Sequence, residues 1–296
     1  MEKSIKNLLV NRYYKSNYSR ALHAFNKAVP YRSFLPEERF EDFIKKYGKL
    51  PAHPNQCYTR GGMNELADER LNLIKSKIHF QPASILEIGP GEGFVLKKYK
   101  EEGVKKAVGV DIKNNLHQEA IDAGVEVILT SAENMNSIPD KSFDVVVSWS
   151  AIEHIPDPKA VFSECLRILK PGGYLFLQFG PLYYSAWGYH HYTVLRCPYL
   201  HLLFPEHLIH QHAKKLYGES FQAYLPWTNG LQLDAYRFLK TPLPYGYLLE
   251  SYSSGYEYLS PSSKMIIEFP EIFKSKNVPF ENFFVDWMQI GIYRQE

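Results

Sequence analysis

Three glycines, each two residues apart, follow a short apolar run, and an acidic residue precedes the first of them. The segment reads Ser84-Ile85-Leu86-Glu87-Ile88-Gly89-Pro90-Gly91-Glu92-Gly93. An apolar run of this length that stops at glycine indicates a buried strand. Glycine frees the backbone for a sharp turn and for close approach by a ligand. The pattern from Phe94 to Glu102 is helical, so the segment predicts a strand, a glycine turn and a helix amino terminus, which together form a nucleotide-type cradle.

The spacing of the glycines indicates which ligand the turn suits. The dinucleotide fingerprint G-x-G-x-x-G requires a glycine at position 94, where this chain has Phe94, and its third glycine is Gly93. Glu87, two residues before Gly89, places a carboxylate at the strand end, where it favours a cationic group over a diphosphate. The amino group and sulfonium of S-adenosylmethionine, which carries no phosphate, suit such a carboxylate. A structural turn without a ligand is the alternative.

The chain from residue 59 to 180, the predicted cofactor-binding core, alternates between apolar runs and helical patterns. Strands are predicted at 84–88, 107–111, 125–130, 143–149 and 174–179, with helices at 64–78, 94–102, after Asp111 to about 123, and 158–169. Asp157-Pro158 supplies an N-cap and a first helical position. This alternation predicts an α/β fold with a doubly wound, Rossmann-like parallel sheet. The ligand crevice of such a sheet lies at the carboxyl ends of its strands.

The segments on either side of this core have a different character. Residues 1–58 contain two helical patterns, Lys3 to Phe25 and Pro36 to Tyr47, and predict a helical N-terminal extension. In residues 181–277 the periodicity degrades, and six of the eleven histidines lie between His190 and His212 among many tyrosines. A stretch this long and aromatic predicts a folded cap inserted into the sheet domain. Residues 278–296 contain a last apolar run, predicted as a terminal strand of the core sheet.

Composition excludes several classes of protein. The net charge of +2 gives no electrostatic case for a nucleic-acid partner. The three cysteines have no metal-binding spacing and suit a reducing compartment. Basic residues interrupt the first twenty positions, so no signal core is expected there, and no segment reaches the length of a membrane span. We therefore expect a cytoplasmic protein whose oligomeric state is open.

Three segments of this chain resemble the class I S-adenosylmethionine-dependent methyltransferases, and within them the methyltransferase type 11 group. They are Glu87-Ile88-Gly89-Pro90-Gly91-Glu92-Gly93, Ser150-Ala151-Ile152-Glu153-His154-Ile155-Pro156-Asp157-Pro158 and Leu169-Lys170-Pro171-Gly172-Gly173. The resemblance covers roughly residues 60–180 and, more loosely, the terminal strand. It implies a seven-stranded sheet with an antiparallel last strand, S-adenosylmethionine as cofactor and S-adenosylhomocysteine as product.

The resemblance also implies which residues hold the cofactor. The methionyl part would be surrounded by Glu87, Gly89, Gly91 and Gly93. Asp111 would accept hydrogen bonds from both ribose hydroxyls, a role that suits a carboxylate, and Ile112 would pack on the adenine. The adenine edge would meet Ser131, Ala132 and Glu133, while Ser148 and Trp149 would floor the site near the methyl group. The structural alternatives are a helix N-cap for Asp111 and a solvated loop charge for Glu133.

Histidines supply the candidate bases. Methyl transfer is an in-line displacement in which the protein mainly aligns and desolvates the reactants, but an oxygen acceptor usually also needs a base. His154 follows the fourth predicted strand, and His190 and His191 follow the fifth. Loop shaping or cap packing is the alternative for each. Some quinone-pathway relatives carry two glutamates and a histidine here, but the first place is Ser150 in this chain, so no metal site is predicted.

Several functions fit these residues. The first is methylation of a small-molecule acceptor, at the oxygen of a sugar, a phenol or another secondary metabolite. The second is a lipid or quinone methyltransferase, and the third a catalytically inactive S-adenosylmethionine-binding module. A nicotinamide dehydrogenase fits least, because of Phe94.

Overall fold

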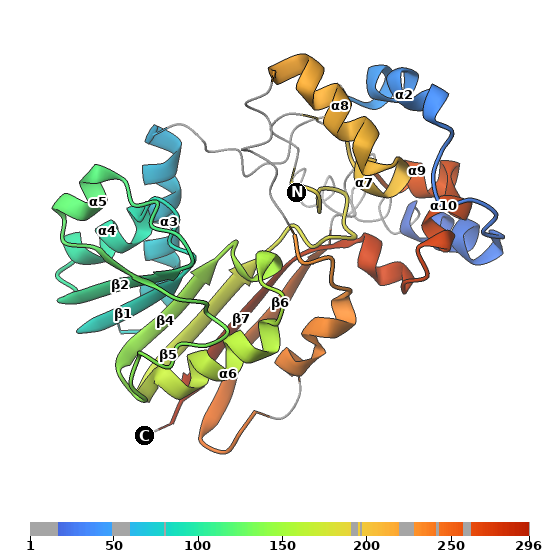
Figure 1. Cartoon of the computed structure of the whole chain (residues 1–296). Helices are drawn as coiled ribbons and strands as arrows, with labels where there is room; N and C mark the ends of the chain where they lie inside the picture. The colour runs from blue at the N-terminus through green and yellow to red at the C-terminus, as the bar shows by residue number, and fades with distance from the viewer. Residues whose placement is uncertain are drawn as a thin grey trace, which may run out of the picture. The chain divides into compact units, whose positions relative to one another are not determined.

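The computed structural model describes residues 17–48, 60–79, 81–190, 195, 197–218, 228–240, 243–256 and 262–295. The chain divides into two compact units (Figure 1). The sheet unit comprises residues 55–180, 234–254 and 287–296, and the helical unit comprises residues 1–54, 181–233 and 255–286.

Seven strands form one sheet in the order β3-β2-β1-β4-β5-β7-β6. They are β1 (Ser84–Ile88), β2 (Lys106–Asp111), β3 (Glu126–Leu129), β4 (Phe143–Trp149), β5 (Leu169–Phe179), β6 (Tyr247–Tyr256) and β7 (Val285–Arg294). Neighbours from β3 to β5 pair in parallel, whereas β7 runs antiparallel to β5. This confirms the predicted α/β sheet with an antiparallel last strand. The strand order reverses between β1 and β4, which is where an open α/β sheet forms its ligand crevice.

Helices cover both faces of the sheet. They are α3 (Arg60–Lys77), α4 (Phe94–Glu101), α5 (Gln118–Asp122), α6 (Pro158–Ile168) and the 3-10 helix η2 (Ile152–His154). Ile85, Val145 and Val147 share a buried cluster with apolar residues of α3, α4 and α5. Figure 1 shows α6 lying along β5, away from α3 and α4. The predicted start of α6 is confirmed, because Asp157 Oδ1 accepts hydrogen bonds from the first backbone amides of the helix.

The beginning of β5 differs from the prediction. The segment Lys170-Pro171-Gly172-Gly173, expected to end a helix, lies within a strand that starts at Leu169. Leu169 pairs with Phe143, and the register then shifts before Val145 pairs with Tyr174. An irregular strand with two glycines has no period-two pattern, so sequence spacing alone showed only the regular part from Tyr174 onward.

The helical unit is built around aromatic side chains. Residues 17–27 are helical, followed by η1 (Glu37–Arg39), α2 (Phe40–Tyr47), α7 (Leu200–Leu203), α8 (Glu206–Tyr217), α9 (Ser262–Glu268), α10 (Pro270–Ser275) and η6 (Phe280–Phe283). The Phe204 ring centroid lies 5.0 Å from that of Phe40 and 5.2 Å from that of Phe43. Leu35 donates its backbone N–H to the carbonyl of Leu203 at 2.8 Å. The N-terminal segment and the segment after β5 therefore share one core.

The boundaries of the predicted cap differ from those of the helical unit. Residues 234–254, placed by sequence within the cap range 181–277, belong to the sheet unit. They contain most of η5 (Leu233–Lys240) and of strand β6. Tyr236 packs on Phe179 with centroids 5.1 Å apart, and Phe238 packs on Phe162 at 5.4 Å. In the part of the chain that the structure describes, no helix has the length and apolar character to cross a bilayer.

Candidate cofactor site

The glycine turn after β1 is packed at one end and open in the middle. Gly89 and Gly91 have φ angles of 67° and 54°, in the left-handed region that glycine adopts without a steric cost. A Cβ at Gly89 would lie 2.5 Å from the Cβ of Ala151, in the segment after β4. A Cβ at Gly91 would meet nothing within 4 Å. The turn is therefore held against the β4 loop at Gly89, and Gly91 leaves room for a ligand beside the backbone.

Glu87 brings a buried carboxylate to this turn. Its side chain is 1% exposed, and its Oε2 atom accepts no hydrogen bond from any described residue. Burial raises the pKa of Glu87 to about 8, although the positive charge of Arg70 opposes that rise. A buried carboxylate oxygen without a partner is costly unless a cation or donor reaches it. This atom is therefore suited to a cationic ligand group.

Arg70 belongs to the same cluster, and the sequence analysis did not find it. Its guanidinium carbon lies 5.2 Å from the centroid of the Trp149 ring, within the range of a cation–π contact. Burial lowers the pKa of Arg70, and the negative charge of Glu87 opposes that effect. The available signal was spacing, because Ala67, Arg70, Leu71 and Ile74 fall on one helical stripe. An arginine on an otherwise buried stripe indicates a nearby anion.

Asp111 and Ile112 lie at the end of the neighbouring strand. Asp111 Oδ1 accepts the backbone N–H of Lys113 at 3.1 Å, so this carboxylate closes the turn after β2. The N-cap of α5 is His117, which contradicts the alternative that Asp111 caps that helix. Ile112 is 74% exposed. A carboxylate with acceptor capacity beside an exposed apolar side chain suits a ribose with an attached flat base.

In the loop after β3, both carboxylate oxygens of Glu133 accept hydrogen bonds. Glu133 Oε2 accepts the hydroxyl of Ser131 at 2.9 Å, and Glu133 Oε1 accepts the backbone N–H of Asp157 at 2.8 Å. Ala132 between them is buried. Glu133 is thus a bonded loop residue rather than a solvated charge. Any contact that it makes to adenine would use the remaining acceptor capacity of these two oxygens.

Ser148 and Trp149 end β4 next to the glycine turn. Ser148 is fully buried and donates its hydroxyl to the carbonyl of Ile88 at 3.2 Å, so it ties β4 to the last residue of β1. Trp149 is 4% exposed, and its ring centroid lies 5.0 Å from that of Phe176. Because Ile88 pairs with both Ser148 and Val110, the ends of β4, β1 and β2 are adjacent. The structure therefore brings the Glu87 turn, Asp111 and Trp149 to one edge of the sheet.

The three candidate bases differ in where the structure places them. His154 ends η2, is half-buried, and donates its backbone N–H to the carbonyl of Ala151 at 3.0 Å. His190 belongs to the helical unit, where its Nε2 lies 2.9 Å from the carbonyl of Pro181. His191 lies outside the described residues. Of the three, His154 alone belongs to the sheet unit.

The residues at this edge fit S-adenosylmethionine. The Oε2 atom of Glu87 offers a free acceptor oxygen for the cationic methionyl end. Gly91 gives access to the backbone, and Asp111 with the exposed Ile112 offers an acceptor and an apolar surface for adenosine. A sulfonium ligand with an adenosine group uses all of these features, whereas a dinucleotide would bring its phosphates toward Glu87.

The sheet order, the antiparallel β7 and the glycine turn define a class I S-adenosylmethionine-dependent methyltransferase domain. Residues 86–177 match the family Methyltransf_11, described as a methyltransferase domain. S-adenosylmethionine is accordingly the cofactor of the domain, as the sequence analysis predicted.

The chain is also similar to curated proteins over part of their length. A ubiquinone biosynthesis O-methyltransferase of Pseudomonas fluorescens (strain SBW25) is 28% identical over 122 residues, which is 39% of this chain and 52% of that protein. Phosphoethanolamine N-methyltransferase 2 of Caenorhabditis elegans is 30% identical over 174 residues, or 54% of this chain and 39% of the relative. The chain thus spans about half the length of the curated relatives that it matches, or less. A solved structure of a putative S-adenosylmethionine-dependent methyltransferase from Listeria monocytogenes has a TM-score of 0.48 at 18% identity, covering 78% of this chain and 100% of that chain.

Proposed function

We propose that this protein transfers the methyl group of S-adenosylmethionine to an oxygen atom of a small molecule. The observation that carries the proposal is the buried, unpartnered Oε2 atom of Glu87 beside a glycine turn that is open at Gly91. Asp111, at the end of the adjacent strand β2, supports it as the acceptor for ribose hydroxyls.

The residues of the sheet unit would act by holding the cofactor in one orientation. The bound cofactor supplies a methyl group on a positively charged sulfur. Glu87 would bind the cationic methionyl end, and Asp111 would fix the ribose. Trp149, which is 4% exposed, would exclude water from the side of the reacting carbon. His154 would remove the proton from an acceptor hydroxyl.

The acceptor would be selected by the helical unit. Trp187, Tyr189, His190 and His201 line a small pocket inside that unit. Tyr189 and His201 stack with ring centroids 5.4 Å apart and an interplanar angle of 6°. Aromatic side chains of this kind offer flat apolar surfaces with a polar edge, on which sugars, phenols and other flat rings stack alike.

A lipid or quinone acceptor is the second candidate. The specific observation in its favour is the name of the Pseudomonas relative, a ubiquinone biosynthesis O-methyltransferase. The nitrogen acceptor in the name of the Caenorhabditis relative makes N-methylation the corresponding alternative at the reacting atom. A catalytically inactive binding module is the remaining alternative.

Transfer of labelled methyl groups tests the proposal. The full chain is incubated with S-adenosylmethionine carrying a labelled methyl group and with sugars, simple phenols, amines and polyprenylated phenols in detergent. We expect labelled product from a phenolic or sugar hydroxyl, and product only from the polyprenylated phenols would favour the second candidate. Binding of S-adenosylhomocysteine without turnover of any acceptor would indicate an inactive module.

A matched pair of variants links that activity to the cofactor site. Asp111→Ala is expected to lose most of its cofactor affinity, because each lost hydrogen bond to a charged group costs roughly 1.5–3 kcal/mol. Asp122→Ala, which changes an exposed aspartate of α5, is the control and should behave like the parent. Equal affinity of both variants for S-adenosylhomocysteine would remove Asp111 from the proposed site.

A further inference from the structure

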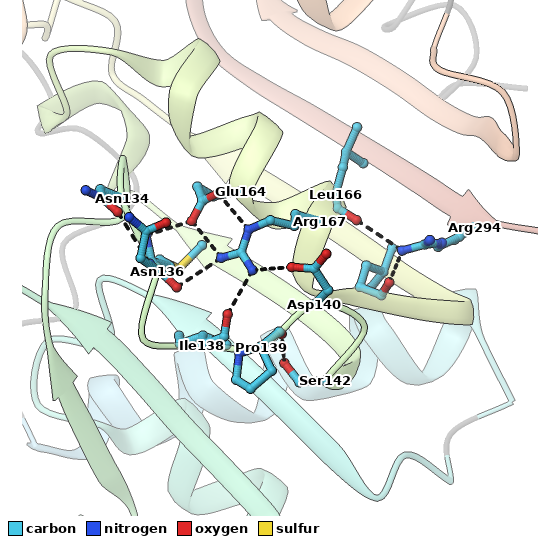
Figure 2. Close-up of polar contacts among 12 residues, drawn as sticks. Asn134, Asn136, Ile138, Pro139, Asp140, Ser142, Glu164, Leu166, Arg167 and Arg294 are labelled. Carbon is cyan, nitrogen blue, oxygen red and sulfur yellow. Dashed lines mark hydrogen bonds and ion pairs between the residues drawn. The ribbon is translucent and has the colours of Figure 1, made fainter.

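A half-buried arginine–glutamate pair on α6 holds the loop that follows β3. Arg167 Nε donates to Glu164 Oε1 at 2.8 Å, and Arg167 Nη2 donates to Glu164 Oε2 at 2.8 Å (Figure 2). Arg167 Nη2 also donates to the carbonyl of Met135 at 2.9 Å, and Arg167 Nη1 donates to the carbonyl of Ile138 at 2.8 Å and to Asp140 Oδ1 at 2.7 Å. All five guanidinium donors are therefore used, which is the full capacity of an arginine.

Glu164 completes a clamp on a single residue of the loop. It accepts the backbone N–H of Met135 at 2.7 Å, while Arg167 donates to the carbonyl of the same residue. The Met135 side chain is fully buried. The hydrogen bonds from Arg167 lower the pKa of Glu164, so the pair stays ionised near neutral pH. Both backbone groups of Met135 are thus fixed by one ion pair. Lysine has a single ammonium group in place of the planar guanidinium, so it cannot make the same set of paired hydrogen bonds.

The clamp adjoins the residues assigned to adenine. Ser131, Ala132 and Glu133 precede Met135 in the same loop, and Asn134 donates its backbone N–H to the carbonyl of Ser131 at 3.0 Å. Glu133 is attached to the other end of α6 by its bond from the backbone N–H of Asp157. The end of α6 at Asp157 and the Arg167–Glu164 pair therefore hold this loop at two points, Glu133 and Met135.

We propose that Arg167 and Glu164 are positioning residues for base recognition, acting through the Met135 clamp on the Ser131–Glu133 loop. This inference rests on the proposed cofactor role of that loop. Neither side chain needs to touch the cofactor. A hydrogen bond to the adenine amino group depends on the position of the loop to within a few tenths of an ångström, so the loss of the clamp reduces discrimination of the base rather than binding of the whole ligand.

The test compares two ligands that differ at one position of the base. Calorimetry measures the dissociation constants of S-adenosylhomocysteine and of S-inosylhomocysteine, in which an oxo group replaces the adenine amino group. The parent protein is expected to prefer the adenine compound by about tenfold or more. Arg167→Lys keeps the positive charge but loses the planar guanidinium and its paired donors. We expect it to reduce that preference at least threefold. Glu164→Gln, which removes the charge of the partner, should act in the same direction.

A second ion pair provides the control. Arg237 and Asp234 have the same three-residue spacing and an Nη2–Oδ1 distance of 2.9 Å, but the Arg237 side chain is 73% exposed. Arg237→Lys should retain the full preference of the parent for the adenine compound. Thermal melting identifies any variant that has unfolded, and Glu164→Gln then serves if Arg167→Lys has done so.

The outcomes separate this inference from the proposed function. If the parent does not bind S-adenosylhomocysteine, both are wrong. If the parent binds and prefers adenine, but Arg167→Lys and Glu164→Gln lose affinity for both ligands equally, the pair only stabilises the fold and the inference alone is wrong. A parent that binds both ligands equally would show that the loop does not recognise the base, and would also overturn the inference.

Discussion

At the scale of single residues, Glu87 is the side chain whose cost to the fold best indicates a ligand. Its carboxylate is buried on the same sheet face as Ile85, with Arg70 as the nearby positive charge. A carboxylate that served only stability would be hydrogen-bonded, because a buried acceptor without a donor is unfavourable. Glu87 retains an oxygen without a hydrogen bond, which supports its proposed role in binding the cationic end of the cofactor.

Glu87→Gln is expected to stabilise the protein in the absence of cofactor at high pH. The pKa of Glu87 in the folded state is about 8, above the usual 4.5. The folded state therefore holds the proton more tightly, and stability falls as the pH rises from about 4.5 through about 8. Glutamine is neutral throughout. We expect Glu87→Gln to melt several degrees higher than the parent at pH 9 and at a similar temperature at pH 4.

The same substitution should weaken cofactor binding, which distinguishes a ligand site from a simple defect. Glu65→Gln, an exposed position on α3, is the control and should leave both melting curves and affinity unchanged. If the melting temperatures of Glu87→Gln and the parent differ by the same amount at every pH from 4 to 9, the buried carboxylate of Glu87 does not lower stability when it ionises.

His154→Gln tests the proposed base. Glutamine keeps a polar side chain of similar length but cannot take a proton. We expect kcat for an oxygen acceptor to fall by roughly 10²–10⁴, with the affinity for S-adenosylhomocysteine within twofold of the parent. His79→Gln, at an exposed position, should retain full turnover. Undiminished turnover by His154→Gln would move the base to His190 or His191, or leave the reaction without one.

The residues that sequence alone could place are those with a role at a strand end. Glu87 lies two residues before the glycine turn and Asp111 directly ends an apolar run, so their location followed from the strand pattern. Arg70 was missed because helical spacing was used only to find apolar faces. The Arg167–Glu164 clamp was also missed, since its partners are backbone groups of a loop with no periodic signal.

At the scale of elements, two glycines of the turn after β1 have different surroundings: one is packed against a neighbouring loop, and the other has free space beside it. Gly89 is closed by Ala151, whereas Gly91 is open on all sides within 4 Å. Both have positive φ angles, so alanine at either position costs roughly 1–2 kcal/mol in the backbone alone. Only at Gly91 should that cost be accompanied by a specific loss of cofactor binding in a protein that still folds.

Gly91→Ala is therefore compared with Gly103→Ala. Gly103, at the end of α4, has a φ angle of 90° and also no neighbour within 4 Å of an added Cβ. We expect the two variants to lose similar stability in thermal melts, and only Gly91→Ala to bind S-adenosylhomocysteine at least tenfold more weakly. Equal affinity of the two variants would show that the turn does not approach the ligand.

The regular elements of the sheet could be predicted because parallel strands are buried on both faces and appear as continuous apolar runs. β6 was not predicted. It lies at the edge of the sheet, where only one side is paired, and its sequence Tyr-Leu-Leu-Glu-Ser-Tyr-Ser-Ser-Gly-Tyr has no apolar run longer than its first three residues. Edge position relaxes the burial requirement that makes a strand recognisable.

At the scale of the whole molecule, two units divide the proposed tasks. The family match lies entirely in the sheet unit, at residues 86–177, whereas the helical unit is assembled from three separate parts of the chain. Its aromatic core joins residues from the N-terminal segment to residues beyond position 260. Such long-range assembly leaves no local periodicity, which is why sequence indicated an aromatic cap without its boundaries.

Trp187→Phe tests whether the helical unit selects the acceptor. Trp187 is buried and lines the pocket of that unit. Phenylalanine keeps an aromatic ring and most of the core volume, so we expect a folded protein whose KM for its acceptor rises at least about fivefold, since a buried aromatic group contributes about 1 kcal/mol or more to a contact. Cofactor affinity should stay within twofold. Tyr31→Phe, on an exposed ring of the same unit, is the control, and equal KM values for the two variants would assign acceptor selection elsewhere.

The central claim is that the glycine turn and its two carboxylates bind a sulfonium cofactor and not a dinucleotide. Calorimetry of the full chain with S-adenosylmethionine, S-adenosylhomocysteine and NAD tests it most directly. We predict saturable binding of the first two ligands, lost in Asp111→Ala and retained in Asp122→Ala, with no heat of binding from NAD. Saturable binding of NAD by a parent protein that does not bind S-adenosylmethionine would contradict the account.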